Sequence, residues 1–110
     1  MKSKAYDGVS FDFFSQGDDH RSLTGTIIMR EDAMVLEIEL PGDDPYTVLG
    51  KPSGHYYIGH HVGAPDHTKV DAKWAGVGDR AYVGSWIEDG EDWLFRFRLP
   101  EKHRPANSQR

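Results

Sequence analysis

The segment from residue 82 to residue 99 reads Tyr-Val-Gly-Ser-Trp-Ile-Glu-Asp-Gly-Glu-Asp-Trp-Leu-Phe-Arg-Phe-Arg-Leu. Its second half carries large apolar side chains at every other position: Trp93, Phe95, Phe97 and Leu99. The positions between them hold Leu94, Arg96 and Arg98. Successive side chains of a strand point to opposite faces, so this half predicts an antiparallel strand with one face to the core and one to water.

The same rhythm recurs along the chain and predicts eight short strands. They cover about Tyr6–Phe14, Leu23–Met29, Met34–Leu40, Tyr46–Gly50, His55–Val62, Thr68–Trp74, Ala81–Ile87 and Asp92–Leu99. The connections are rich in Gly, Pro, Asp and Ser, and none is long enough for the crossover helix that parallel pairing needs. The sequence therefore predicts an all-β, eight-stranded antiparallel up-and-down meander that forms a closed barrel, with a two-sheet β-sandwich as the alternative.

Closure of the barrel has a consequence on its outer face. The first strand would pair with the eighth, which would bring Asp12 close to Arg96 or Arg98 as a cross-strand pair of opposite charge. Four glycines follow mostly apolar pairs inside the predicted strands: Gly25, Gly50, Gly59 and Gly84. Glycines inside strands are typical of bends at barrel corners, so we assign these four an architectural role.

The composition limits the class of protein. The chain has 110 residues, no cysteine and a formal net charge of -5 at pH 7. This length predicts a single barrel domain at residues 1–100, followed by a polar, frayed tail at residues 101–110. The acidic balance argues against a nucleic-acid binder, which would need a basic face. No apolar run is long enough for a membrane span and no apolar stretch opens the chain, which favours a cytoplasmic protein.

The strand count and turn rhythm resemble those of the calycin-like barrels, the lipocalins and avidins. Gly84-Ser85-Trp86 is similar to the lipocalin Gly-x-Trp motif, and Leu23-Thr24-Gly25-Thr26 is similar to an avidin hairpin strand. The resemblance is at the level of the fold and assigns no functional residue. It implies a barrel that holds a small apolar ligand, which is an analogy from fold.

The first functional hypothesis is a module that binds a small, partly apolar ligand between aromatic walls. The residues assigned to this ligand site are Tyr56, His60, Trp74 and Trp86. In this hypothesis His60 points inward and supplies a polar contact. The adjacent His60 and His61 would point to opposite faces of a strand, so we predict no metal site and no cofactor. The competing interpretation is that the aromatic side chains simply fill a small barrel.

The alternative hypothesis is a protein-interaction or inhibitor domain that uses an acidic end. In a meander, alternate loops emerge at the same end, and the residues assigned to this surface are Asp43, Asp44, Glu88, Asp89, Glu91 and Asp92. Such an end would attract a basic protein partner, although acidic residues also suit solvated turns. A barrel-hosted isomerase or cyclase is the third hypothesis. It has no assigned catalytic residue, because the chain lacks nucleophile-elbow, phosphate-loop and His-Glu-x-x-His motifs.

Overall fold

The structure is a computed structural model, and it describes residues 3–17, 19–62 and 69–106. The strands are β1 (Lys4–Ser15), β2 (His20–Met29), β3 (Met34–Leu40), β4 (Asp43–Ser53), β5 (Tyr56–His61), β6 (Val70–Gly78), β7 (Ala81–Glu88), β8 (Glu91–Arg98) and β9 (Arg104–Pro105). Within the described ranges the chain forms no helix of the length and apolarity needed to cross a membrane.

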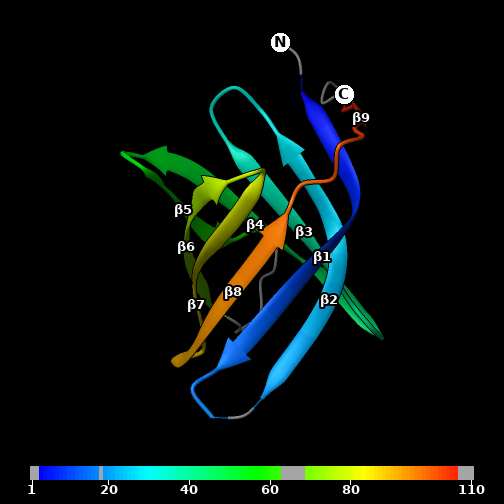
Figure 1. Cartoon of the computed structure of the whole chain (residues 1–110). Coiled ribbons are helices and arrows are strands. Elements are labelled where there is room, and N and C mark those ends of the chain that lie inside the picture. Colours follow the sequence, from blue (N-terminus) through cyan, green and yellow to red (C-terminus); the bar gives the residue numbers. More distant parts are fainter. Residues whose placement is uncertain (1–2, 18, 63–68, 107–110) are drawn as a thin grey trace.

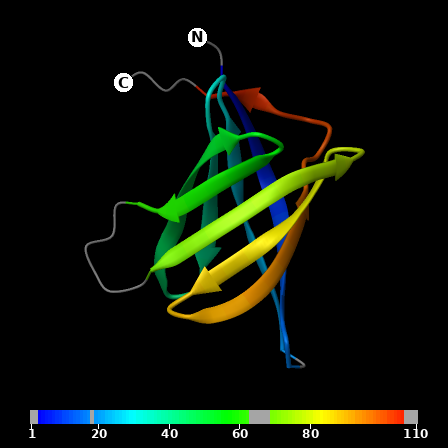
Figure 2. The same ribbon diagram turned by 90° about the vertical axis from the view of Figure 1, so that its left-hand side faces the viewer.

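The strands β1 to β8 form the closed antiparallel meander that the sequence predicts. Each strand pairs with the next along the chain, and β1 pairs with both β2 and β8 (Figures 1 and 2). The β1–β8 pairing runs from Phe11 opposite Phe97 to Ser15 opposite Trp93. Asp12 lies opposite Arg96 in this register, and the Arg96 Nε lies 3.4 Å from Asp12 Oδ2. The expected outer-face pair at the barrel closure is therefore confirmed.

The core consists of the inward faces of these strands and is dominated by aromatic rings. Phe95 stacks on Phe13 with their ring centroids 5.6 Å apart, and it meets the edges of Trp86 and Trp74 at 5.4 Å and 6.0 Å. The inward face of β8 is thus the one that its alternating pattern predicts. Leu94, which precedes Phe95 in β8, points the other way and is 65% exposed on the outer face.

Two of the predicted corner glycines make room for Trp74. A Cβ atom at Gly59 would lie 2.8 Å from ring carbons of Trp74, closer than real Cβ contacts, and one at Gly50 would collide with the same ring. At Gly25 and Gly84 a Cβ would instead collide with a main-chain carbonyl of the neighbouring strand. These close approaches support the architectural role assigned to the four glycines.

The prediction that His60, on β5, points inward is wrong. Tyr57, Gly59 and His61 point inward, whereas Tyr56, Ile58 and His60 are exposed on the outer face. The reason is the register: Ser53 pairs with Tyr56 across a two-residue turn, and Tyr57 stacks on Trp74 at 5.8 Å. Because Tyr56 and Tyr57 are adjacent and both aromatic, the alternation of apolar residues does not show which of them faces the core. The packing of Tyr57 against Trp74 determines the inward face.

Several strands are longer than predicted, because their turns are tighter. The strand β6 continues to Gly78 and meets β7 through Asp79 and Arg80, which both have positive φ angles of 53° and 61°. Two consecutive residues with positive φ are typical of the two-residue hairpin turns that match strand twist. Residues 104 and 105 also differ from the frayed tail expected at 101–110, because β9 pairs with the start of β1. Residues 107–110 lie outside the described residues.

Candidate functional site

The candidate site lies at the mouth of the barrel, where β1, β2, β4, β7 and β8 present inward-facing side chains at one end. We call it the mouth site, and its lining consists of Phe13, Arg21, Leu23, Tyr46, Trp86, Glu88 and Trp93. It encloses a cavity of about 10 Å³. This is close to the smallest space that holds one water molecule. The lining combines aromatic rings with one carboxylate and one guanidinium.

Glu88 supplies the carboxylate of the mouth site. It lies two residues after Trp86, so both side chains point to the same face of β7. The Trp86 indole donates a hydrogen bond from Nε1 to Glu88 Oε1 at 3.0 Å, and the Tyr46 hydroxyl donates one to Oε2 at 2.8 Å. Both oxygens of Glu88 therefore accept a hydrogen bond from an uncharged donor. These two donors do not neutralise the negative charge of the carboxylate.

Tyr46 is held as the donor in this arrangement. Partial burial of the phenol, followed by its hydrogen bond to the Glu88 carboxylate, raises the pKa of Tyr46 to about 12. The phenol consequently stays protonated throughout the neutral range. Its ring also meets the edge of His61 at 5.0 Å and lies 6.1 Å from Trp86.

Arg21 places a cation at the same mouth. It lies opposite the inward-facing Phe13 in the β1–β2 register, and its guanidinium carbon lies 5.1 Å from the centroid of the Trp93 ring. A cation within about 6 Å of an indole face is attracted by the negative face of the ring. Phe13 meets Trp86 edge to face at 5.0 Å and completes the aromatic wall. This arrangement can stabilise a positive charge between aromatic rings and a carboxylate.

The four residues assigned to a ligand site by sequence do not share one wall. Tyr56 is 47% exposed outside the barrel, below the Lys73 ammonium at 4.5 Å. His60 also lies outside, with its Nδ1 2.9 Å from Asp71 Oδ1. Trp74 is buried in the core, and Trp86 alone reaches the mouth site. The inward contact expected of His60 is therefore wrong.

The residues assigned to an acidic end do lie at one end of the meander. The hydrogen bond between Tyr46, near the start of β4, and Glu88, at the end of β7, joins the two strand ends that loop parity predicts to meet. Asp43 and Asp44 begin β4 at this end. Asp89 has a turn role, since its Oδ1 accepts a hydrogen bond from the Lys69 amide at 2.9 Å. Glu91 and Asp92 are exposed at the start of β8.

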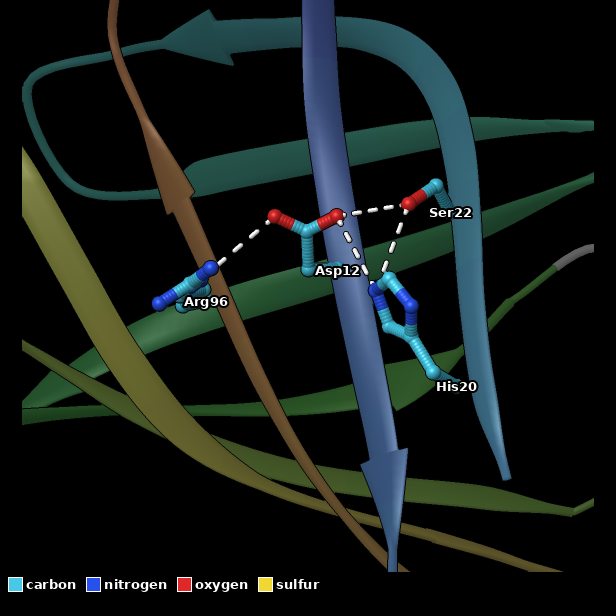
Figure 3. A network of polar contacts seen from close by, with 4 residues as sticks. All are labelled: Asp12, His20, Ser22 and Arg96. Atoms are coloured by element: carbon cyan, nitrogen blue, oxygen red, sulfur yellow. Dashed lines mark hydrogen bonds and ion pairs between the residues drawn. The ribbon is translucent and has the colours of Figure 1, made fainter. Parts of the chain in front are cut away.

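A second polar cluster, on the outer face, combines Asp12, His20 and Ser22 (Figure 3). These are the residue types of a nucleophilic triad, but the hydrogen bonding differs. The Ser22 hydroxyl donates directly to Asp12 Oδ1 at 2.7 Å, and the same His20 Nε2 faces both Ser22 at 3.5 Å and Asp12 at 3.6 Å. In a working triad the histidine bridges the other two residues through its two nitrogens.

The contacts of this cluster link the strands that meet at the barrel closure. Asp12 lies on β1 between Ser22 of β2 and Arg96 of β8, so it bridges the two strands that flank β1. The hydrogen bond from Ser22, with smaller effects of Arg96 and His20, lowers the pKa of the Asp12 carboxyl. These contacts involve the Asp12 carboxylate, so they weaken when acid protonates it.

Among residues 3–17, 19–62 and 69–106, no three His, Asp or Glu side chains are grouped to hold a metal ion. No protein-family model, curated protein or solved structure matches the chain. The closed eight-stranded antiparallel barrel is compatible in general shape with the calycin-like fold.

Sequence reasoning missed most of the mouth site, including Arg21 and Tyr46. It placed Glu88 in a turn and Arg21 in a loop, because both strands were ended too early. Continuing the two-residue period from Trp86 to Glu88, and back from Leu23 to Arg21, would have put both charged side chains on the inward face. That periodicity is the signal that could have identified the site.

Proposed function

We propose that this chain is a binding module that recognises an arginine side chain of a basic partner protein in the mouth site. The observation that carries this proposal is the position of the chain's own Arg21. Its guanidinium lies against Trp93 in a pocket that the Glu88 carboxylate also lines. The site thus already accommodates the chemical group that we assign to the ligand.

The chemistry of the lining supports a cation over an apolar ligand. Indole faces attract guanidinium groups, and a carboxylate close to them adds a charge-assisted hydrogen-bond acceptor. Glu88 uses its two oxygens to accept from Tyr46 and Trp86, and each carboxylate oxygen has a second acceptor position. An incoming guanidinium can therefore bind without breaking these two hydrogen bonds.

The charge around the mouth favours the same ligand. The end of the barrel that holds the mouth site carries four exposed acidic residues in addition to Glu88. They are Asp19, Asp89, Glu91 and Asp92. A concentration of one charge sign accelerates association with a partner of opposite sign, and the acceleration falls as salt rises. The contribution of these residues is to the rate of encounter, whereas the mouth site supplies the contacts.

The test is a titration of the ¹⁵N-labelled protein with the peptide Ac-Gly-Ser-Arg-Ser-Gly-NH₂, followed by the three indole N–H signals. The control peptide carries citrulline, which keeps the shape of arginine and removes its charge. We expect saturable shifts for Trp86 and Trp93 with arginine, with Trp74, which does not line the mouth site, as the reference. A cation–π contact of about 1 kcal/mol corresponds to an affinity roughly fivefold above that for citrulline.

Variants of the protein locate the interaction. Glu88→Gln should weaken arginine binding and leave the citrulline peptide unaffected. Glu101→Gln serves as the matched control, because Glu101 follows β8 at the opposite end of the barrel and is exposed. Equal affinity for the two peptides, or equal loss in both variants, would refute the proposal.

A further inference from the structure

A second surface feature lies where β1 and β8 separate. The chain leaves the end of β8 and runs to β9, which lies beside the start of β1 (Figure 1). The pairing of β1 with β8 stops at Phe11, and the pairing with β9 covers Lys4 and Ala5. Between them, residues 6–10 form no main-chain pair with any described residue on this side.

Local sequence explains the separation. Gly8 has a φ of 69°, and the β1–β2 register shifts between Tyr6 and Val9, so β1 bends here as a bulged strand does. On the other side, the Leu99 amide donates to the Arg80 carbonyl at 2.9 Å, away from β1. Pro100 follows and has no N–H group to offer. Thus neither strand can complete the pairing across the gap.

The gap coincides with a depression on the outer face, which we call the β1–β8 groove. Its volume is about 550 Å³. Its lining consists of Gly8, Val9, Ser10, Asp12, Ala81, Tyr82, Val83, Arg96, Phe97, Arg98, Leu99 and Pro100. Val83 is 45% exposed on one wall, beside the two arginines, and Ser10 forms part of the opposite wall.

The arginines on this wall can exchange their partners. Arg96 lies 3.4 Å from Asp12, and Arg98 lies 2.6 Å from Asp79, and both guanidinium groups are more than half exposed. Ion pairs between exposed groups contribute little to stability, so a carboxylate from a ligand can compete for these arginines. An unpaired strand segment, in turn, offers main-chain donors and acceptors that an extended chain satisfies.

We propose that the β1–β8 groove binds an extended segment of a partner protein that carries acidic side chains. The segment adds to β1 beside residues 8–10, the part of the gap that lines the groove, through main-chain hydrogen bonds. Its carboxylates face Arg96 and Arg98, and an apolar side chain contacts Val83. This surface is separate from the mouth site and binds acidic side chains, whereas the mouth site binds a basic one. Either proposal can therefore be refuted without the other.

The probe is the peptide Ac-Val-Thr-Glu-Thr-Glu-Thr-Val-NH₂, titrated into the ¹⁵N-labelled protein. In an extended chain its glutamates and valines point to the same face, as Arg96, Arg98 and Val83 do. We expect saturable shifts at the amides of Val9 and Ser10, and slower hydrogen exchange at whichever of the two points away from β2, with the Thr47 amide on β4 as reference. A second peptide has the same side chains but N-methyl groups on alternate residues, which removes main-chain donors. Its affinity should be lower by about fivefold or more, because each lost hydrogen bond lowers affinity by about that factor.

Charge is tested by a third peptide and by variants of the protein. Replacing both glutamates of the probe with lysine should weaken binding, as should Arg98→Gln. The control Lys51→Gln changes an exposed cation on β4, away from the groove, and should have no effect. The proposal is overturned if the N-methylated peptide binds as well as the probe, or if Val9 and Ser10 do not respond.

Discussion

Truncation of Phe95 is the most direct test of how the barrel is built. Its side chain is 2% exposed and contacts the rings of Phe13, Trp74 and Trp86. The Phe95→Ala variant removes one ring from the centre of this aromatic cluster and leaves a cavity, because close-packed neighbours relax only in part. The neighbouring Leu94 provides a matched control, since it is large and apolar but 65% exposed.

The expected loss is large relative to the stability of a domain of this size. Truncation of a buried Phe costs about 3–5 kcal/mol, which includes both the lost transfer free energy and the cavity. The whole free energy of unfolding of such a domain is about 5–15 kcal/mol. The Leu94→Ala change should alter it by only about 0.5 kcal/mol, as is usual for exposed positions.

Urea unfolding followed by tryptophan fluorescence measures both variants. With a slope of about 2 kcal/mol per molar urea, the midpoint for Phe95→Ala should fall by roughly 1.5–2.5 M. The midpoint for Leu94→Ala should stay close to that of the parent protein. If the Leu94 variant lost as much stability as the Phe95 variant, the assignment of inward and outward faces in β8 would be refuted.

Three further outcomes follow from individual contacts. The hydrogen bond from Ser22 lowers the pKa of Asp12 below the ordinary value of an aspartate, so the stability it contributes should be present above that ordinary pKa and lost as pH falls through the folded-state pKa. Urea unfolding of Asp12→Asn between pH 6 and pH 2 should show a loss of stability relative to the parent that disappears in acid. Gly59→Ala should lower the free energy of unfolding by about 1–3 kcal/mol, because its Cβ would press on the Trp74 ring; an unchanged urea midpoint would contradict this. Alkaline absorbance titration should show one tyrosine ionising at about pH 12, and Tyr46→Phe should remove that step.

The regular parts of this fold could be predicted because their alternation is unambiguous. From Trp93 to Leu99 every inward position is large and apolar, and two of the three outward positions between them carry arginines, so only one register buries the right face. Short connections then dictate antiparallel pairing between neighbours. Closure followed from strand number, and the contact between Asp12 and Arg96 follows from closure.

The face of β5 and the extent of the strands could not be predicted in the same way. Tyr56 and Tyr57 are chemically alike, and the choice between them depends on Trp74, which belongs to another strand. The position at which a strand ends also depends on residues distant in sequence. Glu88 remains in β7 because it pairs with Val70 of β6 and Glu91 of β8. The mouth site is built from such strand ends, which explains why sequence reasoning found only part of it.

The strongest constraint on the proposed mouth site comes from the residue that now occupies its rim. A ligand guanidinium must replace Arg21, so its apparent affinity is reduced by the fraction of molecules in which Arg21 has left Trp93. An exposed cation–π contact is worth about 0.5–1 kcal/mol, which leaves Arg21 displaced in roughly 15–30% of molecules.

Arg21→Ala should therefore raise the affinity for the arginine peptide by about threefold to sixfold, the reciprocal of that fraction. The measurement is the same indole titration at fixed salt, with Lys69→Ala as a control for the loss of one positive charge at this end of the barrel. If both variants bind more tightly by the same factor, the gain is a general effect of charge and Arg21 does not compete for the site. If Arg21→Ala weakens binding of the arginine peptide, Arg21 contributes to the bound state and does not occupy the place of the ligand guanidinium, which contradicts the proposed replacement.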